Sequence, residues 1–259
     1  MTAEVFGVRI SSGLVMTKVT NAPTDHSKIA ATRSTELCMA WVDVLSFTAT
    51  CSTICLFMCG TQIISRIHKH GTTEGTGIAP FLLTAISCAG WTGYGVLKND
   101  GAVILVNGVG LVIQSLYLLY YYRMTHYPRK RNITRLLLFT LFLYTVTFLY
   151  VQSDRPHSEK ENYMGLICML LTIATIGSPL VDVGQVIRTK STESMPFMLC
   201  VTNMAVSVQW LLYGILVDDI YMKIPNFIAV LISGMQLSLF IVYPPNSSRL
   251  PHKSSDIIL

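Results

Sequence analysis

Two stretches of this chain are identical at six matched positions: WTGYGVLKNDGAVILVN at residues 91–107 and WLLYGILVDDIYMKIPN at residues 210–226. At an offset of 119 residues they share the pattern W-x-x-Y-G-x-L-x-x-D-x6-N. An apolar chain matches itself by chance at Leu and Val, but hardly at Trp, Tyr, Asp and Asn in order. The same offset aligns Thr73-Glu74 with Thr192-Glu193, each ahead of a proline. The chain therefore contains an internal duplication, which indicates a repeat architecture.

Apolar residues dominate the chain around this repeat. Of the 259 residues, 51% are hydrophobic and 13% are charged, and the mean hydropathy is +0.51, whereas soluble domains carry about 25% charged residues. The apolar residues form runs of about twenty, which cross a hydrocarbon core of about 30 Å as helices. We predict an all-α membrane protein with seven transmembrane helices, at 41–64, 79–97, 102–122, 133–152, 163–187, 196–217 and 222–243.

The duplication divides the seven spans into two three-helix units joined by one helix. We predict a first repeat at 41–122, a cytosolic loop and linker helix at 123–162, and a second repeat at 163–243. Because each unit has an odd number of spans, the linker gives both repeats the same orientation, so the 3+1+3 bundles are parallel. Residues 1–40 and 244–259 are predicted to be tails, the first of them disordered. A cleft is expected where the halves face each other, which favours a transporter over a receptor.

Basic residues predict the orientation. Eleven of the nineteen Lys and Arg residues, but only three of the fourteen acidic residues, lie in or beside the 65–78, 123–132 and 188–195 loops and the C-terminal tail. By the positive-inside rule these segments are cytosolic, so the N-terminus is extracellular or lumenal. The net charge of +5 then follows from topology, and no nucleic-acid partner is expected. Both glycosylation sequons, at Asn132 and Asn246, are predicted to face the cytosol and stay unmodified.

Fixed charge is nearly absent from the spans. Asp43 is predicted near the outer end of the first span, and Asp182 toward the inner end of the fifth. An acid within a membrane is a functional hypothesis by default; for Asp182 a gate or helix-end role is favoured over proton coupling. Three cysteines, Cys51, Cys55 and Cys59, share one helix face without a histidine, which favours a helix–helix contact over a metal site. No enzyme chemistry, cofactor or metal is expected.

Neutral polar residues are predicted near the middle of the membrane in both repeats: Ser87, Trp91, Asn107, Ser207, Trp210 and Asn226. A buried carboxamide is costly unless it is hydrogen-bonded, so one interpretation is that the asparagines tie helices together. Their pairing, one asparagine and one tryptophan per repeat, suits a ligand rich in hydroxyl groups. A carboxamide offers donors and an acceptor to adjacent hydroxyls, and an indole face covers C–H groups while its N–H stays available. These residues are therefore a candidate site for a neutral sugar.

Prolines lie at corresponding places in the two halves. Pro80 and Pro196 open the second and sixth spans, and Pro179 lies within the fifth. Each removes an intrahelical hydrogen bond and permits a bend. Membrane helices tolerate single prolines, so it is their correspondence that predicts paired hinges.

Taken in order, these motifs resemble the SWEET (MtN3/saliva) sugar transporters, and most of all their animal branch. The resemblance covers about residues 42–243 and rests on GWTGYGVLKNDGAVILVNGVG (90–110), YPRKR (127–131), GSPLVDVGQVIRTKSTESMPF (177–197), QWLLYG (209–214) and PNF (225–227). SWEET transporters are themselves a known instance of parallel repeats. The resemblance implies bidirectional uniport of mono- or disaccharides such as glucose, with a substrate site at Asn107, Asn226, Trp91 and Trp210. It also implies hinges at Gly60, Pro80, Pro179 and Pro196.

Gly60 departs from the family pattern, because the family has proline at that hinge. The glycine acts either as a flexible point or as a small residue packed against a neighbouring helix. Two alternative functions stay open. The PQ-loop exporters share the 3+1+3 plan but have Pro-Gln where this chain has Ser178-Pro179-Leu180, and a regulatory or scaffold role is the other. We expect a multi-pass protein of the plasma membrane, the Golgi or both, with the lipid bilayer and a sugar as partners, assembled as a homo-oligomer.

Overall fold

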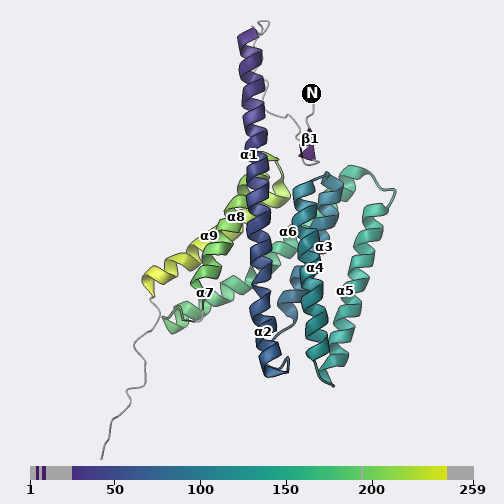
Figure 1. The fold of residues 1–259 in the computed structure, drawn as a ribbon, viewed down its shortest axis with the longest axis vertical. Coiled ribbons are helices and arrows are strands. Elements are labelled where there is room, and N and C mark those ends of the chain that lie inside the picture. Colours follow the sequence, from purple (N-terminus) through teal and green to yellow (C-terminus); the bar gives the residue numbers. More distant parts are fainter. Residues whose placement is uncertain (1–3, 6–7, 10–24, 194, 244–259) are drawn as a thin grey trace, which may run out of the picture.

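The computed structural model describes residues 4–5, 8–9, 25–193 and 195–243 (Figure 1). Its helices are α1 Asp25–Met58, α2 Gly60–His70, α3 Ala79–Lys98, α4 Gly101–Met124, α5 Arg129–Gln152, α6 His157–Thr175, α7 Gly177–Thr189, α8 Phe197–Leu216 and α9 Ile220–Val242. Two short strands, β1 Glu4–Val5 and β2 Val8–Arg9, pair antiparallel. The predicted C-terminal tail 244–259, with its sequon at Asn246, lies outside the described residues.

Seven segments of the described chain are long and apolar enough to cross a membrane. The first combines α1 with α2, the fifth combines α6 with α7, and α3, α4, α5, α8 and α9 each form one more. These segments confirm the predicted all-α membrane fold with seven spans. The first helix begins at Asp25, within the tail predicted to be disordered, because Lys, Ala, Arg and Glu between positions 25 and 40 favour helix.

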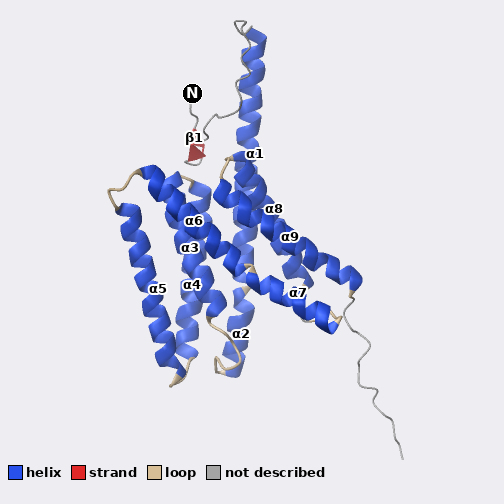
Figure 2. Cartoon of the chain, turned by 180° about the vertical axis from the view of Figure 1, so that it is seen from behind, coloured by secondary structure: helices blue, strands red, loops and turns tan. Residues whose placement is uncertain are grey.

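The two halves pack by equivalent contacts. In the first half α1 and α3 both pack on α4, and in the second α6 and α8 both pack on α9. The halves meet at two seams, α1 with α8 and α3 with α6. The 119-residue offset converts one seam into the other, so an approximate two-fold axis runs along the bundle between them. The linker helix α5 packs on α3 and lies at the edge of the bundle (Figures 1 and 2).

The first and fifth spans are each broken at corresponding places. In the fifth span α6 ends at Thr175, four residues before Pro179, because proline has no N–H to donate to the Thr175 carbonyl. In the first span the break falls at Cys59, where Cys59 N–H donates to Leu56 O and Gln62 N–H donates to Cys59 O. These bonds reach back three residues instead of four, so the chain tightens locally. Both halves therefore carry a helix break in their first span.

Gly60, directly after the first break, is tightly packed. A Cβ atom built there would lie 2.5 Å from Cε2 of Tyr117 and 3.2 Å from Cε1 of Phe81. Real side chains do not come so close, so a larger residue would have to displace the Tyr117 ring. The geometry thus supports the packed-glycine interpretation of this position.

The two ends of the bundle differ. The end that holds the α3–α4 and α8–α9 connections, at the top of Figure 1, is called the Asp100 end, and the opposite one the Pro80 end. In both views α7 and the last turns of α9 diverge from α2, α3 and α4 toward the Pro80 end (Figures 1 and 2). The predicted orientation would place the Pro80 end in the cytosol.

Candidate functional site

A cavity of about 200 Å³ lies between the two halves and is lined by three helices of each. Five of the six predicted polar residues line it together: Ser87, Trp91, Asn107, Trp210 and Asn226. The other lining residues are Thr53, Phe57, Thr84, Cys88, Val103, Val106, Thr172, Val206 and Met222. Among the described residues, none that lines this cavity is an acid, a lysine, an arginine or a histidine. The cavity is thus uncharged and partly polar.

Ser207, the sixth predicted residue, is not among the lining side chains, although it is buried. The offset of 119 residues maps Ser87 onto Val206, and Val206 does line the cavity. Consecutive residues on a helix point about 100° apart. Ser207 is the polar residue of the two, but its neighbour Val206 is the one that faces the cavity, so the prediction of Ser207 as a lining residue is wrong. At this pair of matched positions the cavity has a hydroxyl in one half and an apolar side chain in the other.

The two asparagines make matching bonds within their own helices. Asn107 Nδ2 donates to Val103 O at 3.0 Å, and Asn226 Nδ2 donates to Met222 O at 2.9 Å. Within the described chain no hydrogen bond from either asparagine reaches another helix, so this geometry does not support the interpretation that they tie helices together. One N–H and the carbonyl oxygen of each carboxamide are left for a ligand in the cavity.

The two tryptophans cross between the halves. Trp91 Nε1 donates to Thr172 Oγ1 at 3.0 Å, and Trp210 Nε1 donates to Thr53 Oγ1 at 2.9 Å. Thr53 and Thr172 are themselves 119 residues apart, so the bonds are repeat-related. The expectation of a free indole N–H is not met, because each N–H is already bonded to the opposite half. What each tryptophan presents to the cavity is its ring.

Two tyrosine–aspartate pairs join the halves at the Asp100 end. The Tyr94 hydroxyl donates to Asp219 Oδ2 at 2.5 Å, and the Tyr213 hydroxyl donates to Asp100 Oδ2 at 2.9 Å. All four residues are buried. Each tyrosine ring also stands edge-on to the tryptophan that precedes it by one helical turn, with centroids 5.5 Å apart. The cavity is therefore covered on this side by a continuous aromatic and hydrogen-bonded layer.

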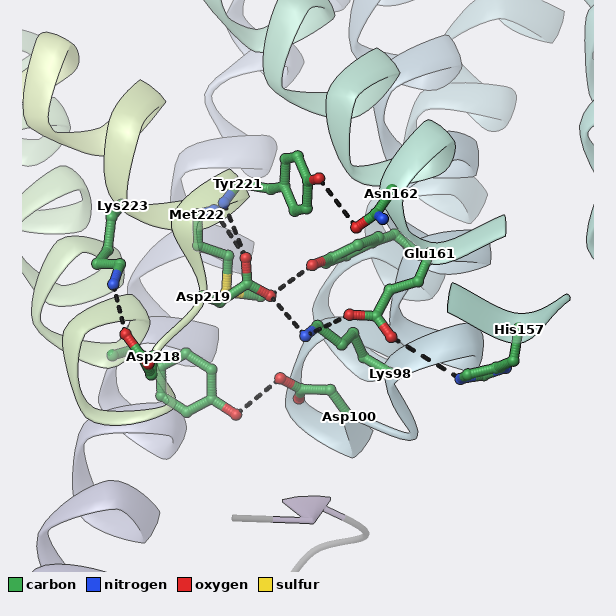
Figure 3. A network of polar contacts seen from close by, with 12 residues as sticks. Lys98, Asp100, His157, Glu161, Asn162, Asp218, Asp219, Tyr221, Met222 and Lys223 are labelled. Atoms are coloured by element: carbon green, nitrogen blue, oxygen red, sulfur yellow. Dashed lines mark hydrogen bonds and ion pairs between the residues drawn. The ribbon is translucent and has the colours of Figure 1, made fainter. Parts of the chain in front are cut away.

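The same aspartates begin helices. Asp100 Oδ1 accepts the Val103 N–H at the start of α4, and Asp219 Oδ1 accepts the Tyr221 and Met222 N–H groups at the start of α9 (Figure 3). A carboxylate is stabilised there by the helix dipole as well as by these bonds. Burial nevertheless raises the pKa of Asp100 above its ordinary value, so this carboxylate becomes protonated at a higher pH than an exposed aspartate does. Each aspartate thus caps a helix of its own half and bonds a tyrosine of the opposite half.

An ion-pair group crosses the α3–α6 seam (Figure 3), and none of the described side chains forms an ion pair across the α1–α8 seam. Lys98 Nζ lies 2.7 Å from Glu161 Oε1 and 3.8 Å from Asp219 Oδ2, so α3 is held to α6 and to the start of α9. At the offset of 119, Lys98 corresponds to Val217 and Glu161 corresponds to Val42, and both valines belong to the apolar cluster at this end. At this end the α3–α6 seam is therefore held partly by charge, whereas the matched residues of the α1–α8 seam are apolar. Farther along the α1–α8 seam, Ser52 Oγ donates to Gln209 Oε1 at 2.6 Å.

The Pro80 end contains a larger cavity of about 480 Å³ between the first half and α8. It is lined by Leu56, Phe57, Cys59, Gly60, Gln62, Ile63, Pro80, Phe81, Thr84, Gln114, Pro196, Met198, Leu199 and Thr202. Polar contacts here stay within one half; for example, Arg129 donates to Thr73 O and Thr192 donates to Tyr243 O. In the described ranges no hydrogen bond or ion pair joins the halves at this end. The described polar bonds between the halves thus lie at the Asp100 end and around the central cavity, and the Pro80 end contains the larger cavity.

Three of the predicted hinge residues, Gly60, Pro80 and Pro196, line this larger cavity. Pro179 lies at the break between α6 and α7 and lines neither of the two cavities. Asp182 lies on α7, partly exposed, and it too lines neither cavity. The structure therefore does not bring Asp182 into the asparagine–tryptophan site.

Sequence reasoning assigned no role to Tyr94, Tyr213, Asp100 or Asp219. The signal was present, because a tyrosine and an aspartate recur at matched positions of the two repeats. Thr53 and Thr172 also match at the same offset but lie outside the quoted stretches. Position alone does not tell whether Tyr94 bonds the aspartate of its own half or that of the other.

Comparison with known proteins agrees with this architecture. The family model described as "Sugar efflux transporter for intercellular exchange" matches the chain twice, over residues 43–131 and 162–248. The protein "Sugar transporter SWEET1" of Drosophila pseudoobscura pseudoobscura is 37% identical over 209 residues, which cover 79% of this chain and 91% of that protein. The human protein of the same name is 35% identical over 202 residues, which cover 76% of this chain and 89% of that protein.

A solved structure, that of a eukaryotic SWEET transporter, superposes with a TM-score of 0.71 at 28% sequence identity. The match covers 78% of this chain and 98% of that one. The two family matches fall on the two halves of the internal duplication and leave α5 between them. On these grounds the chain belongs to the MtN3/saliva, or SWEET, family of transporters.

Proposed function

We propose that this protein is a bidirectional, facilitative sugar transporter that works as a uniporter by alternating access. The observation that carries the proposal is the uncharged cavity between the halves, which places two carboxamides and two indole rings together. A neutral polyhydroxylated ligand fits such a lining, because nothing in it attracts or repels a fixed charge. Two relatives are named as sugar transporters, which supports a sugar as the substrate.

Asn107 and Asn226 hold the sugar hydroxyls in this proposal. Each carboxamide is oriented by one bond to its own helix, which leaves its oxygen and its second N–H for the ligand. Trp91 and Trp210 cover the C–H faces of the sugar ring with their own rings, whose orientation is fixed by the threonine bonds across the seams. The tryptophans therefore provide shape and apolar contact, while the asparagines provide hydrogen bonds.

The different contacts at the two ends support alternating access: the Tyr–Asp pairs join the halves at the Asp100 end, and a cavity lies between them at the Pro80 end. With the Tyr–Asp pairs formed, a sugar reaches the cavity only from the Pro80 end. If the Pro80 end closes and the pairs break, the same cavity opens to the other side. The helix breaks at Cys59 and Ile176, and the prolines at the starts of α3 and α8, allow the Pro80 end to move while the Asp100 end stays packed.

The membrane and orientation are part of the proposal. The basic residues of the Pro80 end support a cytosolic location for it, with the N-terminus extracellular or lumenal and the C-terminus cytosolic. The plasma membrane and the Golgi membrane both fit this topology. A homo-oligomer is the proposed assembly, although each chain contains both halves of the cavity lining.

Transport is expected to need no ion gradient. No acid, lysine, arginine or histidine among the described residues lines the central cavity, so no group there is placed to exchange a proton or bind sodium with the sugar. Radiolabelled glucose should equilibrate across liposomes that contain the purified protein when proton and sodium gradients are absent. Uptake that collapses on addition of a protonophore, or on removal of sodium, would show coupled transport and refute uniport.

Asn107→Ala and Asn226→Ala should each lower sugar flux strongly, by roughly tenfold, while surface expression persists. Each substitution removes hydrogen bonds to the sugar, and one such bond contributes about 1–3 kcal/mol. Helix packing should survive, because each side chain bonds only its own helix. The check is flux normalised to surface protein. If both variants kept near-normal flux, the asparagines would not be ligand-binding residues.

Pro179→Ala should slow turnover several-fold with little change in sugar affinity. Alanine restores the N–H that can donate to the Thr175 carbonyl, so α6 and α7 would join into one stiffer helix. Because Pro179 does not line the cavity, binding contacts stay intact. Transport rate and substrate affinity, measured on the same preparation, separate the two effects. Full turnover in this variant would mean that the gate bends elsewhere.

A further inference from the structure

A groove of about 400 Å³ lies between α5 and α6, apart from the two cavities described above. Its lining shares no residue with either of them. Both helices pack on α3 and not closely on each other, which leaves the groove between them. Thr147 of α5 and Met164 of α6 meet over α3 at its floor, because a Cβ atom built at Gly93 would lie 3.6 Å from Thr147 Cγ2 and 3.5 Å from Met164 Cε.

The sides of the groove face the membrane. Val146, Tyr163 and Ile167 line it and are 45%, 53% and 49% exposed, although all three belong to spans. Side chains exposed on a span contact the lipid hydrocarbon. Tyr150 on the α5 side and Tyr163 on the α6 side place their rings almost perpendicular, with centroids 6.5 Å apart. A membrane lipid therefore has direct access to an apolar groove with aromatic sides.

The groove is polar where it approaches the Asp100 end. Arg155 lies in the connection between α5 and α6, and its Nη1 is 2.8 Å from Oε1 of Glu159 in the first turn of α6. Both residues line the groove, and their charges cancel. Tyr150, two residues before the end of α5, has a buried hydroxyl that makes no hydrogen bond with any described residue. The groove thus combines an apolar body with a neutral polar end that contains an unpartnered hydroxyl.

Three of the lining residues also form a short sequence pattern. Val146-x3-Tyr150-x4-Arg155 fits L/V-x1–5-Y-x1–5-K/R, a pattern associated with cholesterol contact. Such a short pattern recurs readily in membrane spans and carries little weight alone. Here the structure adds an independent observation, because the three side chains that define the match line one membrane-facing groove.

A second match in the chain shows the difference. Leu118-x-Tyr120-x2-Arg123 also fits the pattern, at the Pro80 end of α4. Leu118 is buried in an apolar cluster, and the Tyr120 hydroxyl lies 2.8 Å from Nδ1 of His68. None of its three defining residues lines the α5–α6 groove. This second match therefore serves as an internal control.

We propose that the α5–α6 groove binds one sterol molecule. The rigid apolar ring system lies between the tyrosine rings, over Thr147 and Met164. The single sterol hydroxyl lies at the polar end, where it supplies the hydrogen bond that the Tyr150 hydroxyl lacks and reaches the Glu159 carboxylate. The site does not depend on the sugar pathway, since it shares no lining residue with that pathway.

The charges at the polar end favour a sterol over an anionic phospholipid. Arg155 is already paired with Glu159. Lys160 Nζ donates to the main-chain oxygens of Val151 and Ser153, both at 2.9 Å. Residues 154–161 contain three acidic and two basic side chains, so the segment offers no net attraction to a phosphate. An uncharged head with one hydroxyl group matches these surroundings.

Photolabelling of the wild-type chain locates the sterol without any substitution. The purified full chain in phosphatidylcholine nanodiscs is labelled with a photoreactive cholesterol analogue, and the cross-linked peptides are identified by mass spectrometry. Labels should fall on α5 and α6 between residues 146 and 167, and excess cholesterol should remove them. Labels spread evenly over the exposed faces of the spans, or centred on residues 118–123, would overturn the proposal. Competition by phosphatidylserine as effective as that by cholesterol would show a general lipid groove and overturn it too.

Binding of radiolabelled cholesterol to variants tests the assigned contacts. Tyr150→Phe should weaken binding about fivefold, which corresponds to the loss of one neutral hydrogen bond. Val146→Trp should weaken it at least tenfold, because the indole fills the groove. The matched controls, Tyr120→Phe in the second pattern and Leu138→Trp at a site on α5 that is 60% exposed, should bind as the wild type does. If both groove variants, monodisperse on gel filtration, bound cholesterol like these controls, the groove would not be the sterol site.

Discussion

Two carboxylates organise the Asp100 end of this protein. Each of Asp100 and Asp219 uses one oxygen to cap its own helix and the other to accept a tyrosine hydroxyl from the opposite half. A buried carboxylate is stable only when its oxygens are hydrogen-bonded, so capping and closure support each other. In the proposed transport cycle, opening of this end breaks both Tyr–Asp pairs and leaves each freed oxygen to be hydrated by water. The proposed alternation depends on this constraint, because in that cycle the cavity opens to one side only while the pairs persist.

The duplication makes the two halves equivalent, and a few residues make them different. The tryptophan–threonine and tyrosine–aspartate bonds all recur at the 119-residue offset and define a symmetric frame. Among the departures superimposed on it are Lys98 and Glu161 against two valines, Ser87 against Val206, and Phe57 against Ile176. The first makes one seam charged, so salt should loosen the α3–α6 seam more than the α1–α8 seam. The other two lie at or beside the cavity, where asymmetry suits a sugar that has no two-fold axis.

Much of the fold was predictable because it depends on composition and spacing. Long apolar runs predict spans, and a repeated Trp, Tyr, Asp and Asn pattern predicts parallel halves. The asparagine–tryptophan site followed from the pairing of polar residues in apolar runs. The rest depends on which helices touch. The indole N–H groups are taken by Thr53 and Thr172, which only the seams reveal. Val206 faces the cavity instead of Ser207 because of helix rotation, and the crowding of Gly60 comes from Tyr117 on another helix.

In the proposed transport cycle, the Asp100 end and the Pro80 end open in alternation. Distances between spin labels at repeat-related positions test it directly, with labels introduced as unnatural amino acids because the chain has seven native cysteines. One pair, at Val96 and Ile215, is exposed near the Asp100 end, and another, at His70 and Thr189, is exposed at the Pro80 end. On addition of a transported sugar, pulsed electron paramagnetic resonance should show a second population in which the Val96–Ile215 distance is longer and the His70–Thr189 distance is shorter. Two distances that lengthen together, or that do not respond to the sugar, would contradict alternating access in this protein.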